Sequence, residues 1–360
     1  MSSLRPSQSI CCSPCLEFAE DSDEIVLGNA YDVIVVKSMN HGFFSNENFI
    51  AKFPRRIEES HRLVLEVGTQ QAEFISHPSS SSDPGRVFDL DFDGSFHGRS
   101  SLQELSRCLS PGRNPVRYLL LNDETIVGVA YANIFLWSYN DKVVISDIDG
   151  TITKSNAGGI YDTILTERYS HCHEEVCRFF STVATEKQIR VLYVTSRPIS
   201  LASRTRKFLD NLRQQQHRLP EGPILGFRGN FAQLLIMELV SYQTHHFKAE
   251  ILWTNVVEPF RKAGLTNEIF QAAFGNTEMD VQAYNMVAVP LSRTYLIKNS
   301  KIHSFDKCED SDEFVKLEPK TLKHSNSWRP EMPRHWYRRK IGTTFEGYGD
   351  PRLREHIILV

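Results

Sequence analysis

Asp147 and Asp149, with one residue between them, follow the apolar run "VVIS", and Gly150 and Thr151 come next. Alternate residues of an extended chain point to the same side, so the two carboxylates would lie close together and repel each other. Removing them from water costs free energy unless a positive group lies beside them. The pattern therefore predicts a site where a cation joins two acids; the alternative is a paired-acid turn or a helix cap.

Three later segments place further polar groups where strands are expected to end. Thr195 closes "VLYVT", Lys248 precedes "AEILW", and Asn276 follows "AAFG" with Asp280 about one helical turn later. In doubly wound sheets, ligands bind beyond the carboxyl ends of the strands, so these groups would converge on the two acids. Alone, each has an ordinary explanation as a cap, a surface charge or a turn. Together, their oxygens suit Mg²⁺ and the remaining groups suit a phosphoryl group.

The elements that must position these residues change in character along the chain. From Ile25 to Phe74 and again from about 113 to 140, short apolar segments alternate with turn residues, which predicts strands. After residue 156, helical spacing alternates with short apolar runs, which predicts an α/β fold with a mostly parallel sheet covered on both faces. The helices expected are "EEVCRFFSTVATEK" and "ISLASRTRKFLDNLRQQQHRL", and the strands are "IRVLYVTS", "GPILGF", "AEILWT" and "QAAFGN".

The bulk composition is that of an ordinary globular protein. The chain has 360 residues, 41% hydrophobic and 24% charged, with a formal net charge of -3. This charge argues against a nucleic-acid binder that relies on a basic body. No apolar run approaches the roughly 20 residues that span a bilayer, so we expect no transmembrane segment. Seven scattered cysteines fit a reducing cytosol.

The order of the motifs resembles that of the haloacid dehalogenase-type phosphatases. The segments "IFLWSYNDKVVISDIDGTITKSN", "LYVTSRP", "LPEGPIL", "FK" and "AAFGNTEMDVQAY", across residues 131 to 298, resemble the catalytic region of the lipins, the Mg²⁺-dependent phosphatidate phosphatases. "YDVIVVKS" through "VLEVG" resembles the N-terminal region of that family. The resemblance implies a Rossmann-like catalytic domain and an immunoglobulin-like β-sandwich, formed by the N-terminal strands together with those before the catalytic motif.

The division of the chain that this resemblance implies has six parts. They are a flexible tail (1–22), N-terminal strands (23–76), a Ser/Gly-rich linker (77–112), the remaining sandwich strands (113–140), the catalytic domain (141–305) and a basic and aromatic extension (306–360).

The resemblance also implies a role for each site residue. Asp147 would attack phosphorus and form an aspartyl-phosphate, while Asp149 would protonate the departing diacylglycerol oxygen and later activate water. Mg²⁺ would be held by the Asp147 side chain, the Asp149 carbonyl and Asn276, with Asp280 acting through water or orienting the ligands. Thr195 and Lys248 would bind the phosphoryl oxygens, helped by the backbone N–H groups of Gly150 and Thr151.

A lipid substrate requires contact with a membrane. Residues 1 to 24 lack the short amphipathic helix with which lipins usually begin, so the basic and aromatic C-terminal segment is the candidate. Aromatic side chains prefer the bilayer interface, and basic ones are attracted to anionic lipids. The candidates are Trp328, Trp336, Arg338 and Arg339; the alternative is that this segment packs against the domain. The expected location is the cytoplasm or nucleus, peripherally on the endoplasmic reticulum or nuclear membrane.

Two other functions remain open at this point. A non-catalytic module would bind phosphatidate without hydrolysing it, but Asp147 and Asp149 are both present. A phosphatase of the same type would act on a soluble ester or a phosphoprotein, but the lipin-like segments around the motifs count against this. Release of phosphate from phosphatidate vesicles separates all three functions.

Overall fold

The computed structural model describes residues 25–46, 49–54, 61–68, 70–74, 108–154, 171–227, 244–265, 268–305 and 341–359. The predicted tail, most of the predicted linker and the candidate membrane contacts Trp328, Trp336, Arg338 and Arg339 lie outside these residues. Of the helices in the described ranges, none combines the length and apolar character needed to cross a bilayer.

The first sheet joins the N-terminal strands to those that precede the two acids. Its order is β3-β2-β8-β7-β5-β6, and β1 pairs with both β8 and β4. The strands are β1 (Val26–Ala30), β2 (Val33–Lys37), β3 (Phe43–Ser45), β4 (Ala51–Lys52), β5 (His61–Val67), β6 (Gln70–Phe74), β7 (Gly112–Asn122) and β8 (Thr125–Ser138). The N-terminal strands and the later strands β7 and β8 share one hydrophobic core. The immunoglobulin-like description of this sheet stays a prediction.

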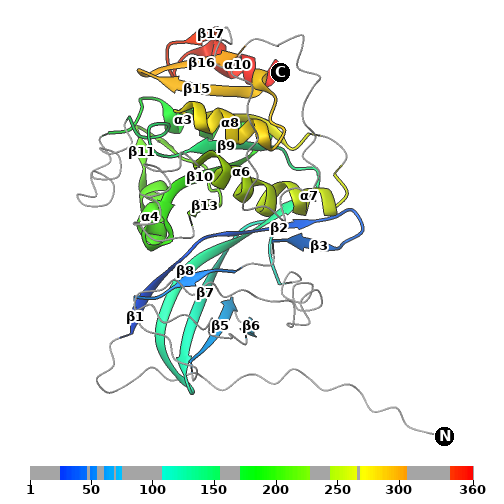
Figure 1. Ribbon diagram of the computed structural model, residues 1–360, viewed down its shortest axis with the longest axis vertical. Helices are drawn as coiled ribbons and strands as arrows, with labels where there is room; N and C mark the ends of the chain where they lie inside the picture. Colours follow the sequence, from blue (N-terminus) through cyan, green and yellow to red (C-terminus); the bar gives the residue numbers. More distant parts are fainter. Residues whose placement is uncertain are drawn as a thin grey trace, which may run out of the picture.

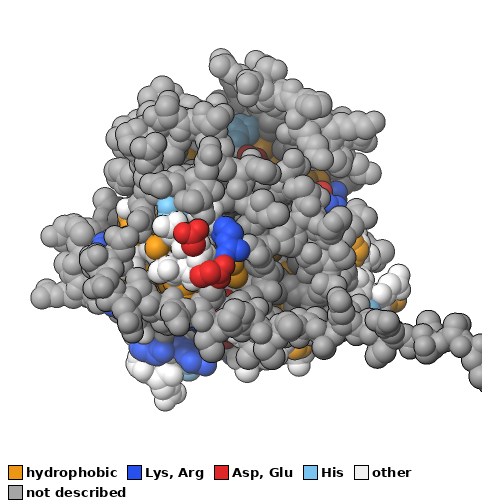
Figure 2. Space-filling view, turned by 90° about the horizontal axis from the view of Figure 1, so that it is seen from below, with side chains coloured by type: hydrophobic (Ala, Val, Ile, Leu, Met, Phe, Trp, Pro, Cys, Tyr) orange, Lys and Arg blue, Asp and Glu red, His pale blue; other side chains and the backbone are white. Residues whose placement is uncertain are grey.

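One end of this sheet faces away from the rest of the molecule. Figure 2 looks at that end and shows acidic and basic side chains lying side by side. In the turn between β7 and β8, Glu124 forms an ion pair of 3.0 Å with Arg62. Exposed pairs of this kind contribute about 0–1 kcal/mol, so this is an ordinary solvated surface.

The second sheet carries the predicted site. Its order is β13-β10-β9-β14-β15-β16-β17, parallel from β13 to β15 and antiparallel beyond. The strands are β9 (Val143–Asp147), β10 (Arg190–Pro198), β13 (Ile224–Phe227), β14 (Phe270–Gly275), β15 (Thr294–Lys298), β16 (Lys301–Phe305) and β17 (Ile341–Phe345). After β9 the chain moves to β10 and β13 on one side, and it later returns to β14 on the other. A crevice forms where strand order reverses in this way, so the carboxyl end of β9 is the natural ligand site.

Helices cover both faces of this sheet, which confirms the α/β prediction (Figure 1). Alternation along β9 explains why both faces need a cover, because Val144 packs on one side while Val143 and Ile145 pack on the other. The first face packs against α3 (Val176–Lys187), α4 (Ala202–Asn211) and α10 (Pro351–Leu359). The second packs against α6 (Thr244–Leu252), α7 (Glu258–Lys262) and α8 (Glu278–Met286).

Two predicted elements differ from those observed. "AEILWT" is not a strand; it lies in α6 and continues into the π-helical turn Trp253–Val257. Its buried residues Ala249, Leu252 and Val256 recur at helical spacing, and a short apolar run alone does not separate a strand from a buried helix. The long helix expected after residue 199 is also shorter, since α4 ends at Asn211. There the chain turns into the short hairpin of β11 (Arg213–Gln214) and β12 (His217–Arg218).

The two sheets are joined through the chain between β1 and β2. The buried carboxylate of Asp32 accepts a hydrogen bond from the Asn133 backbone N–H at 2.8 Å, within the first sheet. It also accepts one from the Ile224 N–H at 2.9 Å and pairs with Arg206 of α4 at 2.8 Å. One buried acid therefore fastens the first sheet to the second.

Candidate active site

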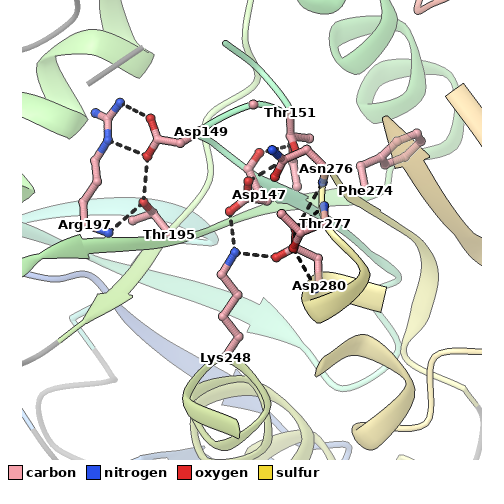
Figure 3. Close-up of polar contacts among 12 residues, drawn as sticks. Asp147, Asp149, Thr151, Thr195, Arg197, Lys248, Phe274, Asn276, Thr277 and Asp280 are labelled. Carbon is pink, nitrogen blue, oxygen red and sulfur yellow. Dashed lines mark hydrogen bonds and ion pairs between the residues drawn. The ribbon is translucent and has the colours of Figure 1, made fainter. Parts of the chain in front are cut away.

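Asp147, Lys248 and Asp280 meet at the carboxyl end of β9 (Figure 3). The Lys248 Nζ lies 2.6 Å from the Asp147 Oδ1 and 2.6 Å from the Asp280 Oδ1, and all three side chains are buried. The convergence predicted from the sequence is therefore present. One detail differs, because Lys248 reaches the site from helix α6 and not from a strand end.

Burial and neighbouring charge change the acidity of this cluster. The pKa of Asp147 is raised to about 7, chiefly by burial; the ammonium of Lys248 opposes this shift, and the carboxylates of Asp280 and Asp149 add to it. Burial alone would lower the pKa of Lys248, but the charges of Asp147 and Asp280 hold it above its ordinary value. Lys248 therefore keeps its charge, yet the site retains more negative charge than one ammonium balances.

The loop after β9 is built from its own hydrogen bonds. The Ile148 carbonyl accepts from the N–H groups of Ile152 and Thr153 at 2.9 and 3.1 Å. Gly150 has a φ of 82°, a region that favours glycine, and its N–H donates to the Thr153 Oγ1 at 3.0 Å. The Thr151 hydroxyl turns back to the Asp147 Oδ2 at 3.2 Å. The predicted phosphate donors Gly150 and Thr151 thus lie beside the nucleophile candidate, with the Gly150 N–H engaged within the loop.

A second loop holds Asn276 and Asp280 beside Asp147. Thr277 and Asp280 form a capping box at the start of α8, in which the Asp280 Oδ2 accepts from the Asn276 and Thr277 N–H groups at 3.1 and 3.0 Å. Gly275 permits this approach, because a Cβ there would lie 2.3 Å from the Cβ of Asp280. Asp280 therefore ties the Asn276 loop to Lys248, which fits its predicted orienting role.

Asp149 has a different partner, Arg197, which our sequence analysis did not single out. The Arg197 Nε and Nη2 donate to the two carboxylate oxygens at 2.8 and 2.7 Å, and the Thr195 hydroxyl lies 3.4 Å from the same carboxylate. Figure 3 shows Asp149 turned toward this guanidinium. The one sequence signal for Arg197 was its place two residues after Thr195, at the end of the same strand.

The donors around Asp147 are suited to a hard cation. Within the described ranges, no three His, Cys, Asp or Glu side chains gather closely enough to hold a metal ion by themselves. A metal at Asp147 would therefore need other oxygens, such as the Asp149 carbonyl and the Asn276 amide, which are ligand types that Mg²⁺ accepts. The cluster also has room for a second positive charge, because the carboxylates of Asp147 and Asp280 share one ammonium.

Comparison with known proteins places this site within a recognised family region. The family model LNS2 (Lipin/Ned1/Smp2) matches residues 96–323, more than half of the chain, and this range contains every residue of the site described above.

Individual relatives match over about half of the chain. Nuclear elongation and deformation protein 1 from Schizosaccharomyces pombe is 33% identical over 192 residues, 53% of this chain and 28% of that protein. Phosphatidate phosphatase LPIN2 from Mus musculus is 35% identical over 166 residues, 46% of this chain and 18% of that protein. Phosphatidic acid phosphohydrolase 1 from Saccharomyces cerevisiae is 29% identical over 197 residues, 52% of this chain and 22% of that protein. The matched region thus spans less than a third of each relative.

Proposed function

The chain belongs to the LNS2 (Lipin/Ned1/Smp2) family, and we propose that it is a Mg²⁺-dependent phosphatase that hydrolyses phosphatidate to diacylglycerol and phosphate. The observation that carries this proposal is the buried cluster of Asp147, Lys248 and Asp280, with Asp149 two residues from the nucleophile candidate. The names of relatives such as phosphatidate phosphatase LPIN2 support the choice of substrate.

In the first half of the reaction, a carboxylate oxygen of Asp147 attacks the phosphorus of phosphatidate. The bond from phosphorus to the diacylglycerol oxygen breaks, Asp149 gives that oxygen its proton, and an aspartyl-phosphate remains on Asp147. Lys248 keeps its positive charge beside the attacking group, so it offsets the charge that builds up on the phosphoryl oxygens. The Thr195 hydroxyl, at the same edge of the sheet, binds a phosphoryl oxygen.

In the second half, water attacks the phosphorus of the aspartyl-phosphate. Asp149, now ionised, takes a proton from this water, and phosphate leaves as Asp147 is regenerated. The two hydrogen bonds from Arg197 suit this half, since they orient the carboxylate that accepts the proton.

The Asp147 side chain, the Asp149 carbonyl and Asn276 would hold Mg²⁺, with Asp280 orienting them. Mg²⁺ held there would supply positive charge that neutralises the phosphoryl oxygens and the acids together. Because phosphatidate is a membrane lipid, we further propose that the chain works peripherally at an anionic membrane surface, on the endoplasmic reticulum or nuclear membrane.

The test is phosphate release from phosphatidate vesicles by the full chain. We expect turnover with MgCl₂ and its loss with a chelator. We also expect a loss of at least about 10³-fold in Asp147→Asn, which keeps the shape of the side chain but removes the nucleophile. Circular dichroism would verify that the variant stays folded.

Three outcomes would contradict the proposal. Turnover by Asp147→Asn at the wild-type rate would remove Asp147 as the nucleophile. A large preference for a water-soluble phosphate ester over phosphatidate vesicles would support a phosphatase but show that phosphatidate is not its substrate. Phosphatidate binding without any phosphate release would instead indicate a binding module.

A further inference from the structure

The side chain and backbone of Arg197 are both held in place. Its guanidinium grips Asp149 through two hydrogen bonds of 2.7 and 2.8 Å and reaches the Thr205 hydroxyl of α4 at 3.3 Å. Its backbone N–H donates to the Thr195 Oγ1 at 3.1 Å. Only 1% of the residue is exposed, which is unusual for an arginine. A buried, bidentate arginine fixes both the place and the plane of its carboxylate partner.

The backbone of Arg197 is held in turn by the first sheet. Tyr31 lies between β1 and β2, and its hydroxyl donates to the Arg197 carbonyl at 2.6 Å. Burial raises the pKa of Tyr31, so the hydroxyl stays protonated and remains a donor. Gly226 in β13 makes room for this contact, because a Cβ there would lie 2.2 Å from the tyrosine oxygen.

Neighbouring contacts show that Tyr31 belongs to a fixed connection. Two residues earlier, the Asn29 side chain accepts the N–H of Ser203 at 3.1 Å. One residue later, Asp32 binds Ile224 and Arg206. The chain from Asn29 to Asp32, here named the strap, is thus attached on both sides of Tyr31.

We propose that Arg197 is the positioning residue for the acid and base Asp149, and that Tyr31 of the strap holds Arg197 in its working position. This inference rests on the proposed function. Asp149 must reach the diacylglycerol oxygen in one half-reaction and a water molecule in the other, so its carboxyl group has to be held accurately. The first sheet then contributes to catalysis through Tyr31, although Tyr31 lies outside the matched family region of residues 96–323.

The test compares two buried tyrosines that each donate one hydroxyl to a backbone carbonyl. Tyr31→Phe removes the bond to Arg197, while Tyr193→Phe removes a bond of 2.8 Å to Pro220. With phosphatidate in mixed detergent micelles and MgCl₂, we expect Tyr31→Phe to lower kcat about tenfold, since small misplacements of reacting groups are costly. KM should stay within about twofold, because the substitution removes no contact with the bound substrate. Tyr193→Phe should keep the wild-type kcat.

A double substitution tests whether Tyr31 acts through Arg197. Arg197→Met leaves Asp149 without its clamp, and we expect kcat to fall about 10²-fold with little change in KM. Adding Tyr31→Phe to Arg197→Met should then cost nothing more, because residues that act through one another are not additive. If Arg197→Met does not fold, the comparison of Tyr31→Phe with Tyr193→Phe still decides the matter.

The possible outcomes separate this inference from the proposed function. If the wild-type chain releases no phosphate from phosphatidate, the proposed function fails and this inference fails with it. If the wild type is active and Tyr31→Phe matches Tyr193→Phe in kcat, only the inference is overturned. Equal losses in kcat from both tyrosine variants would also overturn it, since they would indicate a general structural effect.

Discussion

Asp147 and Asp149 are two residues apart, yet their carboxylates have different partners. Asp147 faces Lys248 in a buried cluster, whereas Asp149 is clamped by Arg197. The spacing of the two acids was enough to predict a charged site at the end of a strand. It was not enough to predict the clamp, because nothing in the sequence says which arginine turns inward. Of the site residues, Arg197 is the one that could be identified only from the structure.

Lys248 offers a test at this scale that does not depend on turnover. Lys248→Met leaves Asp147 and Asp280 buried without their shared counter-charge, so we expect the free energy of unfolding to fall by about 3 kcal/mol. Urea titration without Mg²⁺ would measure it. The control is Lys262→Met, which removes a mostly exposed lysine paired with Glu258 at 3.1 Å and should cost no more than about 0.5 kcal/mol. Equal losses in the two variants would contradict the buried cluster.

Among the secondary-structure elements, most of the short apolar runs were predicted well. The β-branched run of β9 and the apolar runs of β10 and β14 gave the right strands, and the mostly parallel sheet followed from their alternation with helices. The error at "AEILWT" has a physical cause, because six apolar-rich residues fit a buried strand and a buried helix equally well. The last element, α10, was not predicted at all, since only coordinates show that it covers the first face of the sheet.

The junction between β17 and α10 predicts a dependence of stability on pH. The Arg352 side chain lowers the pKa of Asp350 to about 2 from 3.8; burial opposes this, and the N–H groups of Glu346 and Arg352 lower it further. A depressed pKa stabilises the folded state above the unfolded value, and this contribution is lost as the pH falls toward the folded value. Asp350→Asn should therefore melt below the wild type at pH 7.

The gap in melting temperature should be equal at pH 7 and pH 5 and shrink between about pH 4 and pH 2. Glu355→Gln, an exposed change in the same helix, is the control and should cost less than about 0.5 kcal/mol at pH 7. A gap that persists unchanged to pH 2.5 would show that the charge of Asp350 is not what joins β17 to α10.

At the scale of the whole molecule, the two large sheets of the described residues are fastened together by the strap. The sequence predicted that N-terminal strands and later strands belong together only through a family resemblance, since strand pairing over such separations leaves no local signal. Asp32 illustrates the difficulty, because it lies in the predicted strand segment "YDVIVVKS" with no local signal, yet it accepts hydrogen bonds from both sheets. The candidate membrane contacts from Trp328 to Arg339 lie outside the described residues and stay a prediction.

The bonds of Asp32 to both sheets lead to a prediction about how the whole molecule unfolds. We expect the wild type to unfold in a single calorimetric transition. Asp32→Ala leaves Arg206 without its buried partner and should cost about 3 kcal/mol. It should also raise the ratio of calorimetric to van't Hoff enthalpy above one, because the sheets would no longer unfold together. Glu124→Ala, which removes an exposed pair, should leave this ratio unchanged. A ratio of one in both variants would show that other contacts couple the sheets.

The place of β5 between β6 and β7 has a consequence for how such chains can grow. Both neighbours are fixed by their pairing to β5, so the connection from Phe74 to Gly112 closes a loop whose ends the sheet already holds. Each doubling of such a loop costs only about 0.6 kcal/mol. Insertions at this point would therefore cost little stability and would leave the geometry of the active site unchanged.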